Sequence, residues 1–153
     1  MSELILLERT DEYYMQEAFK EALKAYDEGE IPVGAVVVCN NKIIARGHNL
    51  TETLNDVTAH AEMIVITSAE NHLGNKYLNE CELYVTLEPC LMCAGAIFWA
   101  QFQKVVYATH DSRLGFTKIS DNILHVKTKV FAGVMKEECD ALLKKFFLNL
   151  RNN

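Results

Sequence analysis

Long hydrophobic runs are missing from this chain of 153 residues, because no apolar stretch approaches the roughly 20 residues that a membrane helix needs. The N-terminal stretch MSELILLERTDEYY also lacks the basic region of a signal peptide, and Glu8 and Arg9 interrupt its short apolar run. We therefore expect no membrane partner and a cytoplasmic location.

Repeats, low-complexity tracts and linkers are absent as well, and the chain contains only two prolines and seven glycines. These absences exclude a repeat architecture or a string of modules. Half of the residues are apolar and 24% are charged, which is ordinary for a globular protein. We expect residues 1–153 to form a single domain that is long enough to bury a core.

Positive charge is scarce, with 15 Lys and Arg residues against 21 Asp and Glu residues and a net charge of −6. This balance argues against a general nucleic-acid-binding surface. Residues 1–100 carry six basic against 16 acidic residues, a net charge of −10, whereas residues 101–153 carry nine against five, a net charge of +4. A polyanionic partner would therefore bind the C-terminal third, where Lys144, Lys145 and Arg151 are candidate contacts.

Paired cysteines are not evident, because the five cysteines form an odd set in a chain without an export signal. A disulfide framework is not expected in that context. A metal site together with isolated thiols is the better interpretation. Cys39, Cys81 and Cys139 are predicted to be inert buried thiols.

Alternating strand and helix patterns run along the chain. A first helix is predicted from Asp11 to Glu28, capped by Thr10 and terminated by Gly29. Two β-rich runs flank the turn Asn40-Asn41 and indicate a hairpin. The remaining elements are predicted as a helix over 59–71 capped by Thr58 and followed by Gly74, strands over 82–88, 104–109 and 128–133, helices over 90–100 and 137–150, and a loop over 110–122.

This order predicts an α/β fold with one sheet covered on both faces, because several of the strands are apolar throughout. The hairpin strands are 33–38 and 42–47. The segment from Glu82 to Thr109 is expected to form a right-handed parallel crossover.

Two ionisable residues interrupt the apolar stretch VTAHAEMIVI, residues 57–66. His60 and Glu62 would be costly inside a buried helix if they were unpaired. A lone histidine on an apolar face is usually a core residue with its hydrogen bonds satisfied. The pair therefore needs a second observation before it can be interpreted as a site.

The stretch TLEPCLMCAGA, residues 86–96, supplies that observation. Cys90 and Cys93 are three positions apart at the start of a helix, so their side chains share a face. Together with His60 they would give three ligands of a tetrahedral zinc site, and the chain offers no credible fourth. Glu62 could then move protons beside the metal. Each residue alone has an ordinary structural explanation, but H-x-E followed by P-C-x-x-C is the signature of zinc deaminases.

The chain resembles the bacterial tRNA-specific adenosine deaminases of the cytidine deaminase-like superfamily. The resemblance runs from about Tyr13 to Phe147 and includes EGEIPVGAVVV, GHNL, DVTAHAEM, LYVTLEPCLMCAGAI, KVVYA and ECDALLKKFF. It implies a three-layer α/β/α fold with a central five-stranded mixed sheet, a homodimer, and hydrolytic conversion of adenosine to inosine at the wobble position of a tRNA anticodon stem-loop.

The resemblance also assigns roles to individual residues. His60, Cys90 and Cys93 would bind one Zn²⁺ per subunit, and Glu62 would be the catalytic proton shuttle. In addition, Asn49 in GHNL and Asp111 in THDSRLG match positions that bind the substrate.

The segment AIFWAQF, residues 96–102, departs from this family and is closer to bacterial guanine deaminases. Deamination of guanine or another free purine is therefore the alternative function. A non-catalytic, zinc-stabilised binding module is a third hypothesis, against which Glu62 argues. Phe98 and Trp99 are predicted to lie in the core or in a dimer interface.

Overall fold

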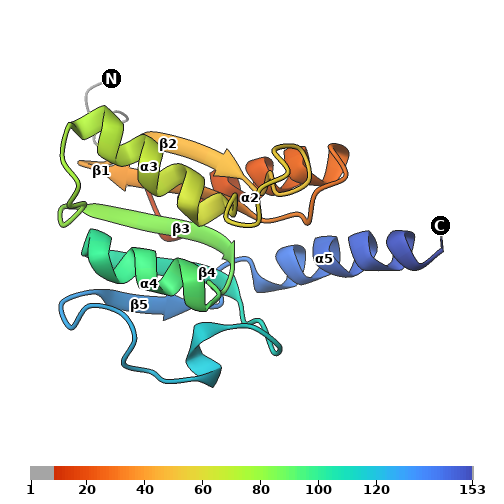
Figure 1. Cartoon of the computed structure of the whole chain (residues 1–153). Coiled ribbons are helices and arrows are strands. Elements are labelled where there is room, and N and C mark those ends of the chain that lie inside the picture. The colour runs from red at the N-terminus through yellow and green to blue at the C-terminus, as the bar shows by residue number, and fades with distance from the viewer. Residues whose placement is uncertain (1–8, 153) are drawn as a thin grey trace.

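A five-stranded mixed sheet lies at the centre of the structure, between two layers of helices (Figure 1). The computed structural model describes residues 9–152. The elements in chain order are α2 (Asp11–Asp27), β1 (Gly34–Cys39), β2 (Lys42–His48), α3 (Ala61–Leu73), β3 (Cys81–Leu87), α4 (Leu91–Ala100), β4 (Lys104–Thr109), the 3₁₀ turn η1 (Phe116–Lys118), β5 (Lys129–Ala132) and α5 (Lys136–Arg151). None of the described helices is long and apolar enough to cross a membrane.

The strands are ordered β2-β1-β3-β4-β5 across the sheet. β1 is antiparallel to both β2 and β3, whereas β3, β4 and β5 are parallel. The predicted hairpin and the predicted parallel pairing are therefore confirmed. Asn40 and Asn41 have φ of 51° and 62°, as a two-residue turn with both central residues in the left-handed region requires.

Each face of the sheet has its own hydrophobic core. Along β1, Ala35 and Val37 pack into the core under α3 and α4, whereas Val36 and Val38 pack into the core under α2 and α5. All six residues of β1 are buried, which explains why this strand is apolar throughout. Helices on both faces give the three-layer α/β/α arrangement that the sequence predicts (Figure 1).

The predicted helix ends are mostly correct, with one error that matters for the site. The Thr10 hydroxyl accepts a hydrogen bond from the Tyr13 N–H at 3.1 Å, and Gly74 ends α3 in the left-handed conformation, both as expected. Thr58 is not the cap of α3, because its N–H and hydroxyl both donate to the carboxylate of Asp56 at 2.8 Å. The N-cap is His60 instead.

The predicted loop over 110–122 is irregular except for η1. Trp99 is 71% exposed, so of its two predicted locations the core is wrong and the dimer interface stays a prediction. Its neighbour Phe98 is half-buried. Cys39, Cys81 and Cys139 are buried, as predicted.

Candidate active site

The three predicted metal ligands lie at the first residues of two helices. His60 and Cys90 are the N-cap residues of α3 and α4, and both have extended backbones with φ of −74°. Neither side chain caps its own helix, so each is free to point beyond the helix end. Cys93 belongs to the first turn of α4 and is fully buried.

The three side chains converge around a point that suits a zinc ion. The His60 Nδ1 atom lies 3.6 Å from the Cys90 sulfur and 3.4 Å from the Cys93 sulfur. Ligand atoms at ordinary Zn–S and Zn–N bond lengths in a tetrahedron would be about 3.6 Å apart. Among the described residues this metal-ligating cluster has three members, all within 4.8 Å of one another. The arrangement therefore fits zinc and leaves one tetrahedral position to a non-protein ligand.

The electrostatics of the thiols also favour a metal. Hydrogen bonds from the Cys93 thiol and from His60 outweigh burial and lower the pKa of Cys90 to about 4. The pKa of Cys93 is raised because its thiol donates to Cys90 and because it is buried. Cys90 is thus a thiolate at neutral pH, and Cys93 holds the proton that metal binding displaces.

Glu62 lies beside this cluster and is 4% exposed. Burial raises the pKa of its carboxyl group to about 7, even though His60 acts in the opposite direction. A carboxyl group with a pKa near neutrality can both accept and return a proton, which is what general acid–base catalysis requires.

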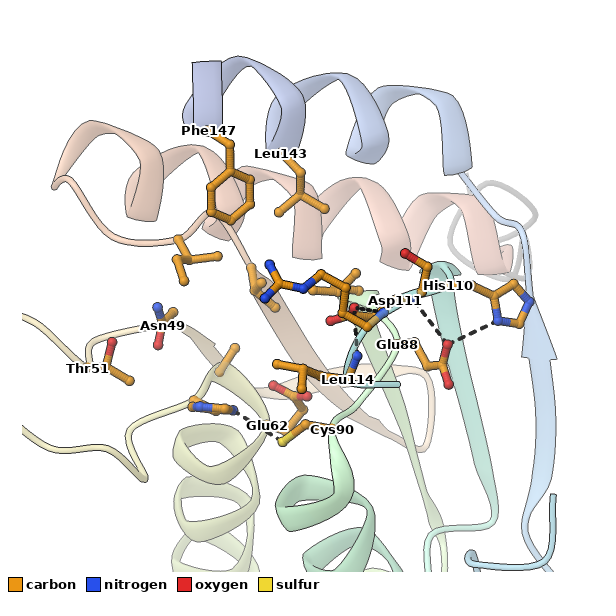
Figure 2. A pocket seen from close by; sticks show the side chains of 17 residues that line it. Asn49, Thr51, Glu62, Glu88, Cys90, His110, Asp111, Leu114, Leu143 and Phe147 are labelled. Atoms are coloured by element: carbon orange, nitrogen blue, oxygen red, sulfur yellow. Dashed lines mark hydrogen bonds and ion pairs between the residues drawn. The ribbon is translucent and has the colours of Figure 1, made fainter. Parts of the chain in front are cut away.

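A cavity of about 450 Å³ opens above His60, Glu62 and Cys90 (Figure 2). Leu143 and Phe147 point into it from α5. The other lining residues come from the start of α3, the end of β3 and the segments before and after the strands: Ile31, Val33, Asn49, Thr51, Ala61, Leu87, Glu88, His110, Asp111, Ser112, Arg113 and Leu114. One cavity therefore brings together His60, Cys90, Glu62, Asn49 and Asp111. Cys93 does not line the cavity, because it is fully buried behind Cys90 and His60.

Asn49 is buried in the cavity wall with an unused acceptor. Its backbone N–H donates to the Val33 carbonyl at 3.1 Å, which fixes the residue at the end of β2. Its side-chain oxygen has no hydrogen-bond partner among the residues that the structure describes. Because buried polar atoms are nearly always paired, this oxygen is suited to a ligand in the cavity.

Asp111 also lies in the wall, but its carboxylate is already engaged. Its Oδ1 atom accepts hydrogen bonds from the N–H groups of Arg113 at 2.9 Å and Leu114 at 3.1 Å. The carboxylate therefore shapes the turn that carries Arg113 and Leu114 along the cavity.

Glu88 is a site residue that the sequence interpretation missed. Its side chain is 1% exposed, and it accepts four hydrogen bonds from the loop after β4. The donors are His110 Nδ1 at 3.1 Å, the Asp111 N–H at 3.0 Å, the Thr117 N–H at 2.9 Å and the Thr117 hydroxyl at 2.7 Å. Burial alone would raise the pKa of Glu88, but these donors outweigh it and lower the pKa. The position of Glu88 beside Pro89 in the TLEPC motif was the available signal.

A second buried carboxylate orders the opposite wall. Glu30 is fully buried and accepts from the Glu52 N–H at 3.1 Å and from the N–H and hydroxyl of Thr53 at 2.6 and 2.7 Å. These bonds fix the segment that follows Asn49. The cavity thus lies between two loops, each held by one buried glutamate.

Leu143 and Phe147 were also missed as site residues. The sequence indicates only that these two residues share a helix face, because they are four positions apart. It does not indicate that this face borders the cavity. Lys144 and Lys145, adjacent on α5, are exposed, and the Lys145 ammonium lies 5.3 Å from the centre of the Tyr26 ring.

Comparison with known proteins identifies the family. The model of the cytidine and deoxycytidylate deaminase zinc-binding region matches residues 8–109, which include His60, Glu62, Cys90 and Cys93. The chain belongs to this family of zinc-dependent deaminases.

Individual relatives narrow the comparison. The chain is 48% identical over 146 residues to the tRNA-specific adenosine deaminase of Bacillus subtilis, covering 92% of this chain and 91% of that protein. A solved structure from work on A-to-I editing by tRNA:A34 deaminases at the wobble position matches with a TM-score of 0.80 and 40% identity, over 86% of this chain and 99% of that one. A guanine deaminase from Bacillus subtilis matches less closely, with a TM-score of 0.66 and 38% identity over 75% of this chain and 77% of that one.

Proposed function

We propose that this protein deaminates adenosine to inosine at the wobble position of a tRNA anticodon, with water as the co-substrate and ammonia as the second product. The observation that carries the proposal is the zinc-ligand cluster with Glu62 beneath an open cavity, in a chain 48% identical to a tRNA-specific adenosine deaminase over nearly its whole length. This function is the one that the family resemblance implies.

Zinc would be held by His60 Nδ1 and by the sulfurs of Cys90 and Cys93. Zinc bound by such a three-ligand set makes water acidic near neutral pH. The chain's own contribution is to fix the ligands at two helix starts and to keep Cys90 in the thiolate form that a metal needs.

Glu62 would carry out the proton transfers. It would first take a proton from the attacking water and deliver it to the purine ring nitrogen. It would then move a second proton, from the hydroxyl group newly bonded to the attacked carbon, to the amino group, which leaves as ammonia. Its burial gives it the near-neutral pKa that both transfers require. The free Asn49 oxygen would orient the base by accepting a hydrogen bond in the cavity.

The open cavity suits a base that is attached to a longer strand. The target adenosine would be turned out of the anticodon loop, where unstacking costs little. Leu143 and Phe147 give the cavity an apolar wall from α5. The basic residues of that helix and of the loop after β4 would neutralise phosphates nearby.

The charge proposal can be tested directly. Replacing Lys144, Lys145 and Arg151 with Ala should raise the KM for tRNA and flatten its dependence on salt, because fewer phosphates are neutralised. Turnover of a small nucleoside should not change. Unaltered tRNA kinetics at every salt concentration would refute the role of these residues.

Guanine deamination is the second candidate, because the AIFWA segment resembles guanine deaminases and a guanine deaminase is among the structural relatives. Neither Phe98 nor Trp99 lines the cavity within one chain, however, so the AIFWA segment does not itself contact a base held there. Mass spectrometry of an adenosine-34 tRNA and of guanine, incubated separately with the protein, decides between them. Inosine in the tRNA supports the first function, and xanthine alone supports the second.

A homodimer remains a prediction of the resemblance. The outer face of α4 supports it, since Leu91, Met92 and Trp99 are 52%, 37% and 71% exposed. Light scattering at micromolar concentration should give twice the chain mass of 17.4 kDa. Only monomers under those conditions would contradict the proposal. The cytoplasmic location and the single domain over residues 1–153 also stay predictions.

A further inference from the structure

Two cysteines that take no part in the proposed reaction lie at the end of the sheet away from the zinc site. Cys39 is the last residue of β1 and Cys81 is the first residue of β3, and the register places them directly opposite each other. Both pack into the core under α3 and α4. Cys81 is therefore separated from the candidate zinc ligand Cys90 by the whole length of β3, which ends at Leu87.

The backbone hydrogen bonds show that these cysteines form a close pair. The Cys81 N–H donates to the Leu78 carbonyl at 2.9 Å, and the Cys81 carbonyl accepts from the Gln103 N–H at 3.0 Å. Both groups are therefore used away from β1. Cys39 and Cys81 are therefore a non-hydrogen-bonded pair of the antiparallel ladder. The Cα atoms of such a pair are about 4.5 Å apart, and the side chains lie close together. That separation lies within the roughly 4.4–6.8 Å that disulfides span.

The thiols also influence each other, and a cavity gives access to them. Burial and then the neighbouring Cys39 thiol raise the pKa of Cys81 to about 12. Both cysteines line a cavity of about 220 Å³, together with Asn40, Asn75 and Tyr77. Cys39 is 9% exposed and Cys81 is 1% exposed, so a reagent that enters this cavity meets Cys39 first.

We propose that Cys39 and Cys81 are an oxidative modification site, which forms an intramolecular disulfide on reaction with a low-molecular-weight disulfide such as oxidised glutathione. The Cys39 thiolate attacks one sulfur of oxidised glutathione and displaces the first glutathione thiolate. Cys81 then gives its proton to solvent, attacks the Cys39 sulfur and displaces the second glutathione thiolate. Two protein thiols are oxidised to one disulfide, and one oxidised glutathione is reduced to two glutathione molecules.

The test uses the zinc-loaded full chain, so that Cys90 and Cys93 stay protected. The protein is incubated with oxidised glutathione, alkylated, digested without reduction and analysed by mass spectrometry. We expect a peptide pair joined through Cys39 and Cys81, with an unchanged zinc content. The linked protein should melt roughly 5 °C or more above the reduced protein, because a disulfide across 42 positions restricts the unfolded chain.

Cys139 provides the control, because it is also buried but lies on helix α5 and packs into the core on the opposite face of the sheet from Cys39 and Cys81. Cys139→Ser should retain the linked peptide pair, whereas Cys39→Ser should lose it. Cys81→Ser should stop at a mixed disulfide between Cys39 and glutathione. The disulfide-linked peptides of the parent protein can be identified without any variant. The proposal therefore stays testable if a serine variant fails to fold.

Two outcomes would overturn the proposal. One is a parent protein in which Cys39 and Cys81 both remain alkylated after oxidation. The other is a parent in which the mixed disulfide at Cys39 accumulates without conversion to the linked pair, since that would show that the two sulfurs do not meet.

Discussion

Two glutamates border the same cavity, both expose little surface to solvent, and their pKa values shift in opposite directions. Glu62 is 4% exposed and its pKa is raised to about 7, whereas Glu88 is 2% exposed and its pKa is lowered. The pKa shifts differ because burial dominates at Glu62, whereas hydrogen-bond donors outweigh burial at Glu88. Glu88 accepts four hydrogen bonds from one loop, but for Glu62 the dominant influence is burial.

Burial alone therefore does not decide what a carboxyl group does in this site. Where too few donors offset burial, the pKa of the carboxyl group rises to near neutrality, and such a group can accept and release a proton. Burial with several donors keeps the carboxylate charged, which suits the ordering of a loop. In the proposed mechanism Glu62 acts on the substrate directly, whereas Glu88 acts through the loop that it holds.

The largest effect should come from removing the proton shuttle. Glu62→Gln keeps the shape of the side chain but cannot accept and return a proton, so kcat should fall by ~10²–10⁴-fold. Zinc content, measured by elemental mass spectrometry, should remain at one per chain. A variant with near-normal kcat would show that the two glutamates do not differ in the way proposed.

Glu88→Gln should act on substrate binding instead. A neutral amide loses the charge-assisted bonds to the loop over 110–117, each of which contributes about 1.5–3 kcal/mol. We expect KM for tRNA to rise by roughly tenfold, the equivalent of one such bond. Steady-state kinetics should show a smaller change in kcat than in KM. A loss confined to kcat would instead make Glu88 a second proton-transfer group.

Gly115→Ala tests the same loop from the other side. A Cβ atom at Gly115 would lie 2.3 Å from the carboxyl carbon of Glu88, so the loop must shift. KM should rise by a few-fold without loss of zinc. Gly95→Ala is the comparison variant, because nothing beyond its chain neighbours and the backbone of its own helix lies within 4 Å of a Cβ there. Because Gly95 shares the outer face of α4 with Leu91 and Trp99, the oligomeric state of both variants is measured first. Equal kinetics for the two alanine variants would mean that Glu88 tolerates displacement of its loop.

The smallest effect concerns acid stability. The folded-state pKa of Glu88 is below its ordinary value of 4.5, so its contribution to the free energy of unfolding is complete above that pH. That contribution is lost as the pH falls below 4.5 through the folded-state pKa. Urea unfolding of the parent and of Glu88→Gln should therefore give free energies of unfolding that converge as the pH falls below 4.5. A constant difference between them would show that Glu88 is not ionised in the folded protein.

Local patterns were sufficient to predict the cluster of candidate metal ligands and most of the helices and strands. His60, Cys90 and Cys93 could be located because each lies at a helix start with ligand spacing, and Asn40-Asn41 identified the hairpin from backbone preference alone. Thr58 was assigned wrongly because Asp56, two residues before it, provides a competing hydrogen bond.

The cavity walls could not be predicted in this way, because they depend on residues far apart in the sequence. The role of Glu88 requires a loop more than 20 residues later to fold back over it. Phe147 reaches the cavity only because α5 packs against the sheet from the far end of the chain. Trp99 lies in a very apolar helix whose outer face is nevertheless exposed.

The bare N-termini of α3 and α4 have an evolutionary consequence. A Ser, Thr, Asp or Asn at an N-cap typically stabilises a protein by about 0.5–2 kcal/mol, and here these two positions hold His60 and Cys90, which do not cap. Selection for thermal stability alone, in the absence of zinc, would therefore favour substitutions such as His60→Asn and Cys90→Ser. Each would strengthen a helix and remove a metal ligand, so a stability screen of this protein will enrich inactive variants unless activity is selected at the same time.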